Sequence, residues 1–391
     1  MALRVGINAV FLGEQAGGVG RYTRQLLAAL IDLDDAPELT VFAGSRLPAG
    51  VLREPWADEV RWVRVPVSPK NPLNLGAQLL GIPVLARLRR LDLIHSPGNT
   101  GPVWSPLPTV VTLHDLIWLH HPTEWHRSRR ARASTRALAI RTAEASTRVL
   151  ADSRAARDDF IETLGLAPQK IDVAPLAADG GEAVPEPEAS LRTRLGLGDR
   201  RFVLAVAQKR RYKRLDTLIR ALPELGDGVA LVLVGPSTPH EDELRETARG
   251  LHVADRVLFI DWVSESSLET LYRACTCFAL PTIIEGFGLP VLEAMRRGVP
   301  VACSRRSSLP EVAGDAALYF DPDVQEQVTA AIRRLMEDSD LRGRLASAGR
   351  RRAASFSWRR TAEATLSSYD RAAASRRRYM ASRGESRDPN S

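Results

Sequence analysis

Short apolar runs alternate with longer amphipathic stretches along most of the chain. The short runs are rich in Val, Leu, Ile and Ala and end at Gly, Pro or charged residues, which is typical of buried strands. Between them, apolar residues recur at the spacing of a helix, as at 22–30 and 129–145. The predicted strands fall into two series, at 4–10, 39–43, 60–65, 91–95, 109–113 and 148–151, and at 202–207, 229–234, 256–260, 277–280, 299–303 and 317–320. Two such series predict an α/β protein with two doubly wound sheets.

A segment without periodicity separates the two series. Residues 177–187 are rich in Ala, Gly and Pro and are interpreted as a linker. Because 391 residues are too many for one ordinary core, we predict one domain over 1–178 and a second over 179–358. A final helix is predicted at 359–375, and the tail at 376–391, which is rich in Arg and Ser, is predicted to be disordered.

The composition is that of a globular protein. Hydrophobic residues make up 44% and charged residues 26% of the chain, close to the average for soluble proteins. The chain has no apolar run long enough to span a membrane, and its N-terminus enters a strand pattern without a signal-peptide h-region. We therefore expect a cytoplasmic protein.

The net charge narrows the choice of partners. It is +7 and comes chiefly from arginine, which suits nucleic acid, a membrane surface or a phosphorylated substrate. The sequence has no helix-turn-helix, zinc-finger or RNP-type signature, and only 6% of its residues are aromatic. Nucleic acid is therefore the least favoured partner, and we predict that the chain does not bind it.

Cysteine and histidine spacing does not predict a metal site. The three cysteines, Cys275, Cys277 and Cys303, lie on or beside apolar runs, where packing is their usual role. Four histidines fall close together without partnering cysteines or an HExxH frame. These are His114, His120, His121 and His126.

Residues 285–293 (EGFGLPVLE) place two carboxylates eight residues apart around a glycine-rich turn and a predicted helix start. Pro290 suits the first helical turn, where its missing N–H has no cost. Glu285 then lies on the loop that follows a strand, and Glu293 about one turn inside the next helix. Ligands bind at the carboxyl ends of parallel strands, and free N–H groups at a helix start favour phosphate. The pattern alone equally allows two solvated surface glutamates.

A basic segment, residues 208–214 (QKRRYKR), follows the first strand of the second series. Cations there would neutralise the charge of a departing diphosphate. The alternative is a solvated basic loop, which is the usual fate of charge runs.

Two candidate segments lie in the first domain. Residues 15–22 (QAGGVGRY) contain three glycines before a predicted helix, where the backbone can approach an anionic ligand closely, although a plain flexible loop is the alternative. His114 and Asp115 close the strand at 108–114. For such a histidine, a hydrogen-bonded place in the core is the more common finding.

Together these four motifs resemble the retaining family 4 glycosyltransferases, also called glycosyltransferase group 1. The flanks of the paired glutamates match as well, at Pro281, at 298–302 (GVPVA) and at 308–312 (SLPEV). The resemblance implies the GT-B fold, in which two Rossmann-like doubly wound domains face each other across a cleft. It also implies that the helix at 359–375 crosses back onto the first domain. An ordinary last helix of the second domain is the alternative.

The resemblance assigns roles to the second domain. Glu293 would hold the nucleotide ribose and Glu285 the hydroxyls of the donor sugar. Lys213 would bind the diphosphate, with Arg210 or Arg211 as its partner, since Gln208 stands where relatives often have arginine. The donor-binding segment would comprise Glu285, Gly286, Phe287, Gly288, Leu289 and Glu293.

In the first domain, the resemblance implies that a loop with Gly17, Gly18 and Gly20 closes over the donor diphosphate. His114 would lie beside the reacting sugar, oriented by Asp115. The residues expected to act in catalysis are then His114, Asp115, Lys213 and Glu285.

The implied chemistry is front-face transfer with retention, in which the leaving diphosphate takes the acceptor proton and no metal or other cofactor is needed. The likeness is greatest to bacterial polysaccharide mannosyltransferases, so GDP-mannose is the first donor and a UDP-sugar the second. The implied acceptor is a glycan or a lipid-linked glycan.

Two other classes stay open. A sugar-nucleotide epimerase shares the GT-B architecture but needs acid and base groups. A membrane-surface or scaffold protein is suggested by the arginine-rich stretch 127–148, which suits contact with the anionic inner face of the plasma membrane but also suits a solvated helix face. Its arginines within the apolar pattern are Arg129, Arg130, Arg132, Arg136 and Arg141.

Overall fold

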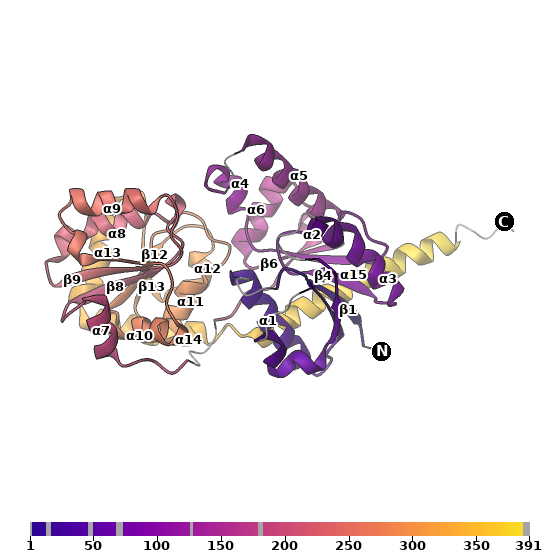
Figure 1. Cartoon of the computed structure of the whole chain (residues 1–391), viewed down its shortest axis with the longest axis horizontal. Helices are drawn as coiled ribbons and strands as arrows, with labels where there is room; N and C mark the ends of the chain where they lie inside the picture. Colours follow the sequence, from indigo (N-terminus) through magenta and orange to yellow (C-terminus); the bar gives the residue numbers. More distant parts are fainter. Residues whose placement is uncertain are drawn as a thin grey trace. The chain divides into compact units, whose positions relative to one another are not determined.

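The computed structural model describes residues 2–12, 17–45, 50–67, 73–125, 128–178 and 183–385. The chain divides into two compact units, which are coloured in chain order in Figure 1. Unit 1 comprises Met1–Leu176 and Ser357–Ser391, and unit 2 comprises Ala177–Phe356. The sequence pattern placed the two boundaries at 178 and 358, close to these positions.

Unit 1 contains a seven-stranded parallel sheet with the strand order β3-β2-β1-β4-β5-β6-β7. Six of its strands match predicted ones. The seventh, β7, has three residues, too short to leave a pattern in the sequence. The strands are β1 Arg4–Ala9, β2 Glu38–Ala43, β3 Arg61–Arg64, β4 Leu93–Ser96, β5 Thr109–Leu113, β6 Arg148–Ala151 and β7 Ile171–Val173.

Helices surround this sheet, and local sequence sets their ends. The Ser153 hydroxyl accepts a hydrogen bond from the Ala156 N–H at 3.0 Å and caps α6, which ends at Gly165 in the left-handed conformation. The helices of unit 1 are α1 Gly17–Ile31, α2 Leu73–Gly76, α3 Ile82–Leu88, α4 Ile117–His120, α5 Arg129–Ala145, α6 Arg154–Leu164 and α15 Trp358–Glu385, with a π-helical turn at Ala77–Gly81.

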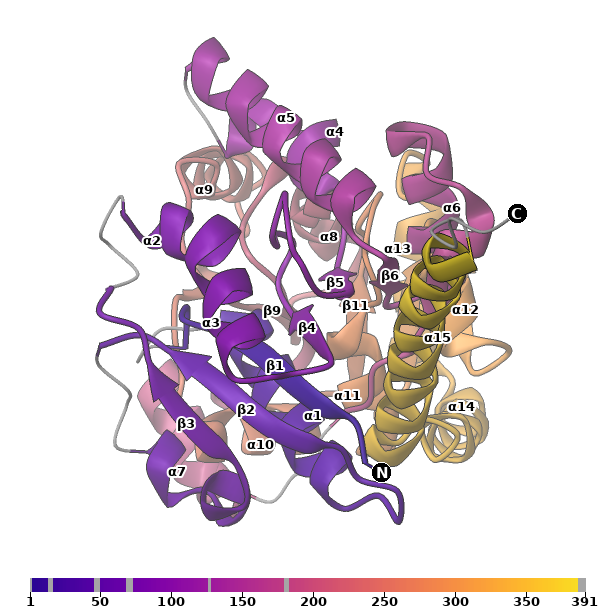
Figure 2. The same ribbon diagram turned by 90° about the vertical axis from the view of Figure 1, so that its right-hand side faces the viewer.

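The last helix, α15, belongs to unit 1, where it packs on α1 and on strands β4 to β7 (Figure 2). The Thr361 hydroxyl donates to the Pro175 carbonyl at 2.6 Å, and Arg359 pairs with Asp34 at 3.0 Å. The alternative of a last helix packed on the second domain is therefore wrong. The helix also continues through 376–385, where disorder was predicted, because Ala, Arg and Met are good helix formers. Residues 386–391 lie outside the described residues.

Unit 2 contains a six-stranded parallel sheet with the order β10-β9-β8-β11-β12-β13. All six strands were predicted. They are β8 Arg201–Val206, β9 Val229–Val234, β10 Val257–Ile260, β11 Cys277–Leu280, β12 Val301–Ser304 and β13 Ala317–Phe320. The helices are α7 Glu188–Leu195, α8 Leu215–Ala221, α9 Glu241–Gly250, α10 Glu265–Ala274, α11 Leu289–Arg296, α12 Leu309–Ala313, α13 Gln325–Glu337 and α14 Ser339–Ala353.

Candidate active site

The strand order of unit 2 reverses between β8 and β11. The chain runs outward from β8 to β9 and β10, then returns to place β11 on the other side of β8. At such a switch point the loops that leave the carboxyl ends of the two strands diverge, which opens a binding crevice. The basic segment 208–214 follows β8, and the segment 285–293 follows β11, so both predicted motifs of this unit lie at its switch point.

Lys213 and Glu285 form an ion pair across these two loops. Each side chain is only 11% exposed, so water screens the pair weakly. A backbone hydrogen bond also links the two loops, because the Tyr212 carbonyl accepts from the Ile283 N–H at 2.9 Å. The predicted phosphate cation and the predicted sugar-binding carboxylate therefore lie side by side in the structure.

The turn before α11 has a backbone that only glycine adopts easily. Gly288 has φ = 103°, and a Cβ there would come within 2.6 Å of the Leu309 side chain. The Ser308 hydroxyl is a hydrogen-bond donor to the carbonyls of Glu285, at 3.0 Å, and Phe287, at 2.8 Å. Ser308 was quoted only as part of a family flank. Its contacts give it a definite task, which is to hold the loop that carries Glu285.

Glu293 lies one turn inside α11 and is 7% exposed. Its Oε2 accepts a hydrogen bond from the hydroxyl of Tyr272 on α10, at 3.0 Å. A solvated helix glutamate, the alternative that the sequence allowed, is excluded for this residue. Tyr272 was not predicted, because it lies outside every motif and looks like an ordinary apolar position of an amphipathic helix.

The basic segment divides its cations among different tasks. Lys209 is fully buried, and its ammonium group donates to the Ile260 carbonyl and to the Asp261 carboxylate, both at 3.1 Å. Arg211 pairs with Glu243 of α9, and the Arg210 guanidinium donates to the Gln208 side chain at 2.8 Å. Of these cations, Lys213 lies beside a predicted donor-binding residue, Glu285.

In unit 1, the predicted glycines lie within a helix rather than before it. Helix α1 begins at Gly17, which has φ = 56°, and Gly20 is buried in its first turns. Among the described residues, no atom lies within 4 Å of a Cβ placed at Gly17 or Gly18. Gln15 and Ala16, the first residues of the motif, lie outside the described residues.

His114 follows β5, and both of its ring nitrogens are engaged. Nδ1 lies 2.8 Å from the Asp152 carboxylate and Nε2 lies 3.1 Å from the Pro97 carbonyl. The prediction that Asp115 orients His114 is wrong. The Asp115 carboxylate instead accepts a hydrogen bond from the Ile117 N–H at 3.0 Å, at the start of α4. Asp152 directly follows the adjacent strand β6. Its place at the end of a neighbouring strand is the feature of the sequence from which its contact with His114 could have been predicted.

This environment favours a charged imidazole. Burial lowers the pKa of His114. The Asp152 carboxylate and the Pro97 carbonyl raise it by more than burial lowers it, so the pKa lies above the usual value of 6.5. Two acceptors around one ring are satisfied only when both nitrogens carry a proton. The edge of the ring also meets Tyr22, with centroids 4.9 Å apart.

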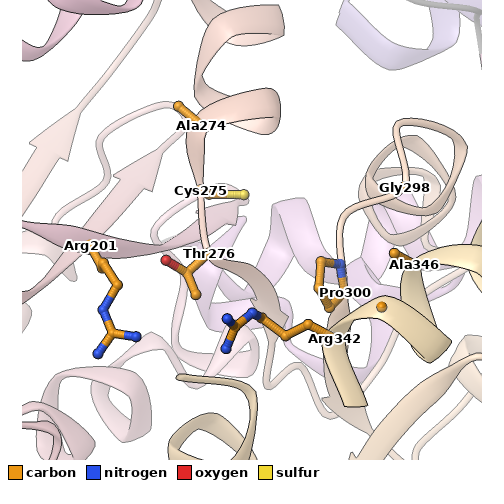
Figure 3. Close-up of a pocket in the computed structure, with 9 residues that line it drawn as sticks. Arg201, Ala274, Cys275, Thr276, Gly298, Pro300, Arg342 and Ala346 are labelled. Carbon is orange, nitrogen blue, oxygen red and sulfur yellow. The ribbon is translucent and has the colours of Figure 1, made fainter. Parts of the chain in front are cut away.

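The hollow drawn in Figure 3 is a different place in unit 2. It encloses about 390 Å³ and is lined by residues at the beginnings of β8, β11 and β12, among them Arg201, Thr276 and Pro300. The Arg201 and Arg342 guanidinium groups both donate to the Met336 carbonyl, at 2.6 and 3.1 Å, where α13 ends. No predicted site residue lines it, so it is not the predicted donor site.

Within the described residues, no cluster of His, Cys, Asp and Glu could hold a metal ion. The described helices also include none that is long and apolar enough to cross a membrane. The three cysteines are buried and unpaired, and burial raises the pKa of each thiol, to about 12 for Cys277.

Each of the two units matches a known protein family in sequence. The model of the family "Glycosyltransferase Family 4" matches residues 16–179, and that of "Glycosyl transferases group 1" matches residues 189–352. O-antigen chain mannosyltransferase B of Escherichia coli is 27% identical over 374 residues, which cover 90% of this chain and 95% of that protein. D-inositol 3-phosphate glycosyltransferase of Kineococcus radiotolerans is 33% identical over 252 residues, covering 59% of this chain and 58% of that protein.

Solved structures show the same fold. Sucrose-phosphate synthase from Thermosynechococcus elongatus has a TM-score of 0.73 at 21% identity, covering 95% of this chain and all of that one. Anabaena HepE in complex with UDP and glucose has a TM-score of 0.71 at 20% identity, covering 94% and 99% of the two chains. Together with the two parallel sheets, these neighbours show that the chain has the two-domain α/β fold of the GT-B type.

The two family models together cover most of the sequence. The chain therefore belongs to the group 1 and family 4 glycosyltransferases, which confirms the resemblance that the motifs carry.

Proposed function

We propose that this glycosyltransferase moves mannose from GDP-mannose, with retention of configuration, to a glycan or lipid-linked glycan during synthesis of a bacterial cell-surface polysaccharide. The name of the Escherichia coli relative, which aligns over nearly its whole length, supports mannose and a polysaccharide product. The observation that carries the site is the Lys213–Glu285 pair at the switch point of unit 2, on the loop that leads into α11, where Glu293 lies buried. A UDP-sugar is the alternative donor, since HepE was solved with UDP and with glucose.

In this proposal the ion pair gives way to the donor. The Lys213 ammonium transfers its contact from Glu285 to the diphosphate, whose negative charge grows as the glycosidic bond breaks. Glu285 is then released to accept hydrogen bonds from the sugar hydroxyls, and Glu293 accepts them from the ribose, because an ionised carboxylate is purely an acceptor. The protein's own cations serve the leaving group, so we propose transfer without a metal ion or other cofactor.

The first test is a thermal-shift screen of GDP- and UDP-sugars, since a bound donor raises the melting temperature by mass action. We expect the largest shift with GDP-mannose. The preferred donor is then incubated with candidate acceptors, and NMR of the product establishes its anomeric configuration. A shift only with UDP-sugars would overturn the choice of donor, and an inverted product would overturn the mechanism.

Lys213→Ala and Glu293→Ala test the site assignment. Each is expected to lower the transfer rate at least about a hundredfold, the scale of losing one group that stabilises transition-state charge or holds the donor. Circular dichroism checks that both variants fold. Arg249→Ala, an exposed arginine on α9, is the control and keeps full activity. Full activity in either site variant would remove that residue from the site.

A sugar-nucleotide epimerase is the second candidate, favoured by the buried His114–Asp152 pair, which can hold and release a proton. Incubation of UDP-GlcNAc without any acceptor separates the two reactions. An epimer in that mixture would establish the second, and an unchanged sugar nucleotide is what a transferase requires.

We further propose that the enzyme works in the cytoplasm, in peripheral contact with the inner face of the plasma membrane, without binding nucleic acid. Exposed arginines on α5, among them Arg129, Arg136 and Arg141, support attraction to anionic lipid.

A further inference from the structure

Unit 1 exposes an apolar stripe on the helical stretch formed by α2, the π turn and α3, which lies in front of the sheet in Figure 2. Leu80, Val84 and Leu88 are 53%, 47% and 73% exposed. Side chains four residues apart lie on the same face of a helix. We call these three residues the apolar stripe. Leu75, also exposed, lies five residues before Leu80 across the π turn and extends it.

The opposite side of the same helix is apolar as well. Ile82, Pro83 and Ala86 are buried there, and Ile82 and Ala86 join the core that contains Phe42 and Ile94. Large apolar side chains on a helix normally face a partner, yet the three of the apolar stripe are at least half exposed or close to it, on the side of α3 away from that core. No element in the described part of unit 1 buries the stripe, and a contiguous apolar surface of this kind marks an interaction site.

Cations flank the end of the stripe. Arg87, Arg89 and Arg90 are all exposed. Among the residues that the structure describes, no carboxylate forms an ion pair with any of them. Three adjacent guanidinium groups beside exposed leucines form an amphipathic surface with a positive edge, the arrangement that suits the boundary between lipid headgroups and acyl chains.

A second copy of the chain fits this surface less well. A two-fold contact centred on the stripe would bring the arginines of both copies together without carboxylates to neutralise them. An anionic lipid surface supplies both partners, because acyl chains accept the leucines and phosphates accept the guanidinium groups. Helix α5 differs, since its described side chains include exposed arginines but no exposed large apolar residue.

We propose that the apolar stripe, with Arg87, Arg89 and Arg90, binds an anionic membrane surface. The leucines insert at the headgroup boundary and the guanidinium groups contact lipid phosphates. This proposal rests on the membrane contact proposed above and names the surface that makes it, and its readout is independent of the sugar donor and of the transfer reaction.

The test is vesicle flotation of the full chain with phosphatidylcholine alone and with added phosphatidylglycerol. We expect flotation only with phosphatidylglycerol. The triple variant Leu80→Gln/Val84→Gln/Leu88→Gln should lower the vesicle affinity at least about tenfold, since it removes the inserted apolar area while Gln keeps helix propensity. The control Val184→Gln/Trp262→Gln alters side chains that are 82% and 80% exposed in unit 2, and it should bind as the wild type does.

A second pair of variants tests the charges. Arg87→Gln/Arg89→Gln/Arg90→Gln should lower the affinity for anionic vesicles about a hundredfold, at roughly fivefold for each arginine. The control Arg249→Gln/Arg344→Gln/Arg351→Gln removes the same net charge from exposed positions of unit 2 and should have a small effect. Circular dichroism checks the fold of every variant.

The proposal is wrong if the wild type does not float with anionic vesicles, or if both α3 variants bind as it does. It is also wrong if Arg129→Gln/Arg130→Gln/Arg136→Gln/Arg141→Gln abolishes binding while the stripe variant binds as the wild type does, because α5 is then the membrane contact. Light scattering adds one more outcome. If the stripe variant turns a dimer into a monomer while lipid binding stays intact, the stripe is an interface between copies.

Discussion

Two neighbouring residues at the end of β5 show how far adjacency in sequence misleads. Asp115 follows His114 directly, yet its carboxylate accepts a hydrogen bond at the start of α4. The carboxylate that meets the imidazole comes from Asp152, one position after β6. Because β5 pairs with β6 in parallel, with Leu113 opposite Ala151, the residues that follow both strands emerge at one edge of the sheet.

The first prediction concerns the charge on His114. Asp152→Asn removes the carboxylate that raises the histidine pKa, so burial then dominates and the pKa should fall below 6.5. In the wild type the pKa is raised, so the ion pair stabilises the fold fully below about pH 6.5. That contribution is lost as pH rises through the raised value. An NMR titration of the ring protons measures the pKa.

Asp115→Asn is the matched control, since it leaves the Asp152 contact in place. We expect only a small decrease in the His114 pKa for this variant. A larger decrease than in Asp152→Asn would restore Asp115 as the orienting residue.

The second prediction concerns Tyr272. Tyr272→Phe removes the hydrogen bond to the buried Glu293 carboxylate and should weaken nucleotide binding by about 1–3 kcal/mol. Calorimetric titration with GDP and UDP measures this. Tyr319→Phe removes another tyrosine hydrogen bond of unit 2, to the Gly314 carbonyl at 2.5 Å, outside the segments 208–214 and 285–293. Equal losses of affinity in the two variants would show that Tyr272 supports only the fold.

At the scale of elements, α15 is held by a buried polar chain. The Tyr369 hydroxyl lies 2.7 Å from His95 Nδ1, and Thr112 bridges His95 Nε2, at 2.8 Å, to the Tyr22 hydroxyl, at 3.1 Å. These side chains come from α15, β4, β5 and α1. The sequence predicted the helix from its apolar spacing, but its partners depend on packing between segments far apart in the chain.

The third prediction follows from His95. Burial, and to a lesser extent the nearby His114, lowers the pKa of His95 to about 3. Between about pH 6.5 and 3 the unfolded chain therefore binds a proton that the native state refuses. Through this residue the free energy of unfolding should fall with decreasing pH, by up to about 1.4 kcal/mol for each pH unit.

Denaturant unfolding of the wild type and of His95→Gln across this pH range measures the effect. The variant should lose this part of the acid dependence, although it is less stable at neutral pH. His252→Gln, at an exposed position in unit 2, serves as the control. Parallel acid profiles for the wild type and His95→Gln would contradict the buried neutral state.

At the scale of the whole molecule, the predicted residues divide between two units with separate sheets and cores. The paired glutamates and Lys213 lie in unit 2, and the glycines and His114 lie in unit 1. That the two sets serve one substrate remains a prediction.

The fourth prediction tests where the nucleotide binds. Hydrogen exchange with and without GDP should show protection of the backbone at 208–214 and 281–293, which follow β8 and β11. Strands β2 and β3 at the edge of the unit 1 sheet should show no change. Protection confined to unit 1 would contradict the assignment of the nucleotide to the switch point of unit 2.

The sequence by itself determined the class of fold, most of the strands and the residues of the predicted donor motif. A short apolar run bounded by Gly, Pro or charged residues is a local property of the sequence, so the strands could be predicted directly, apart from β7. The motif 285–293 also places its glutamates through local geometry, because Gly288 permits the turn and Pro290 the helix start.

Only the tertiary structure decided which distant groups meet. The pairs Lys213–Glu285, Tyr272–Glu293 and His114–Asp152 each join side chains from different strand ends or helices. Their separation in sequence carries no signal, because strand order and helix packing set those contacts. Exposure is likewise a tertiary property, since Ile82 and Val84 look alike in the sequence and lie on opposite sides of one helix, the first in the core and the second in the apolar stripe.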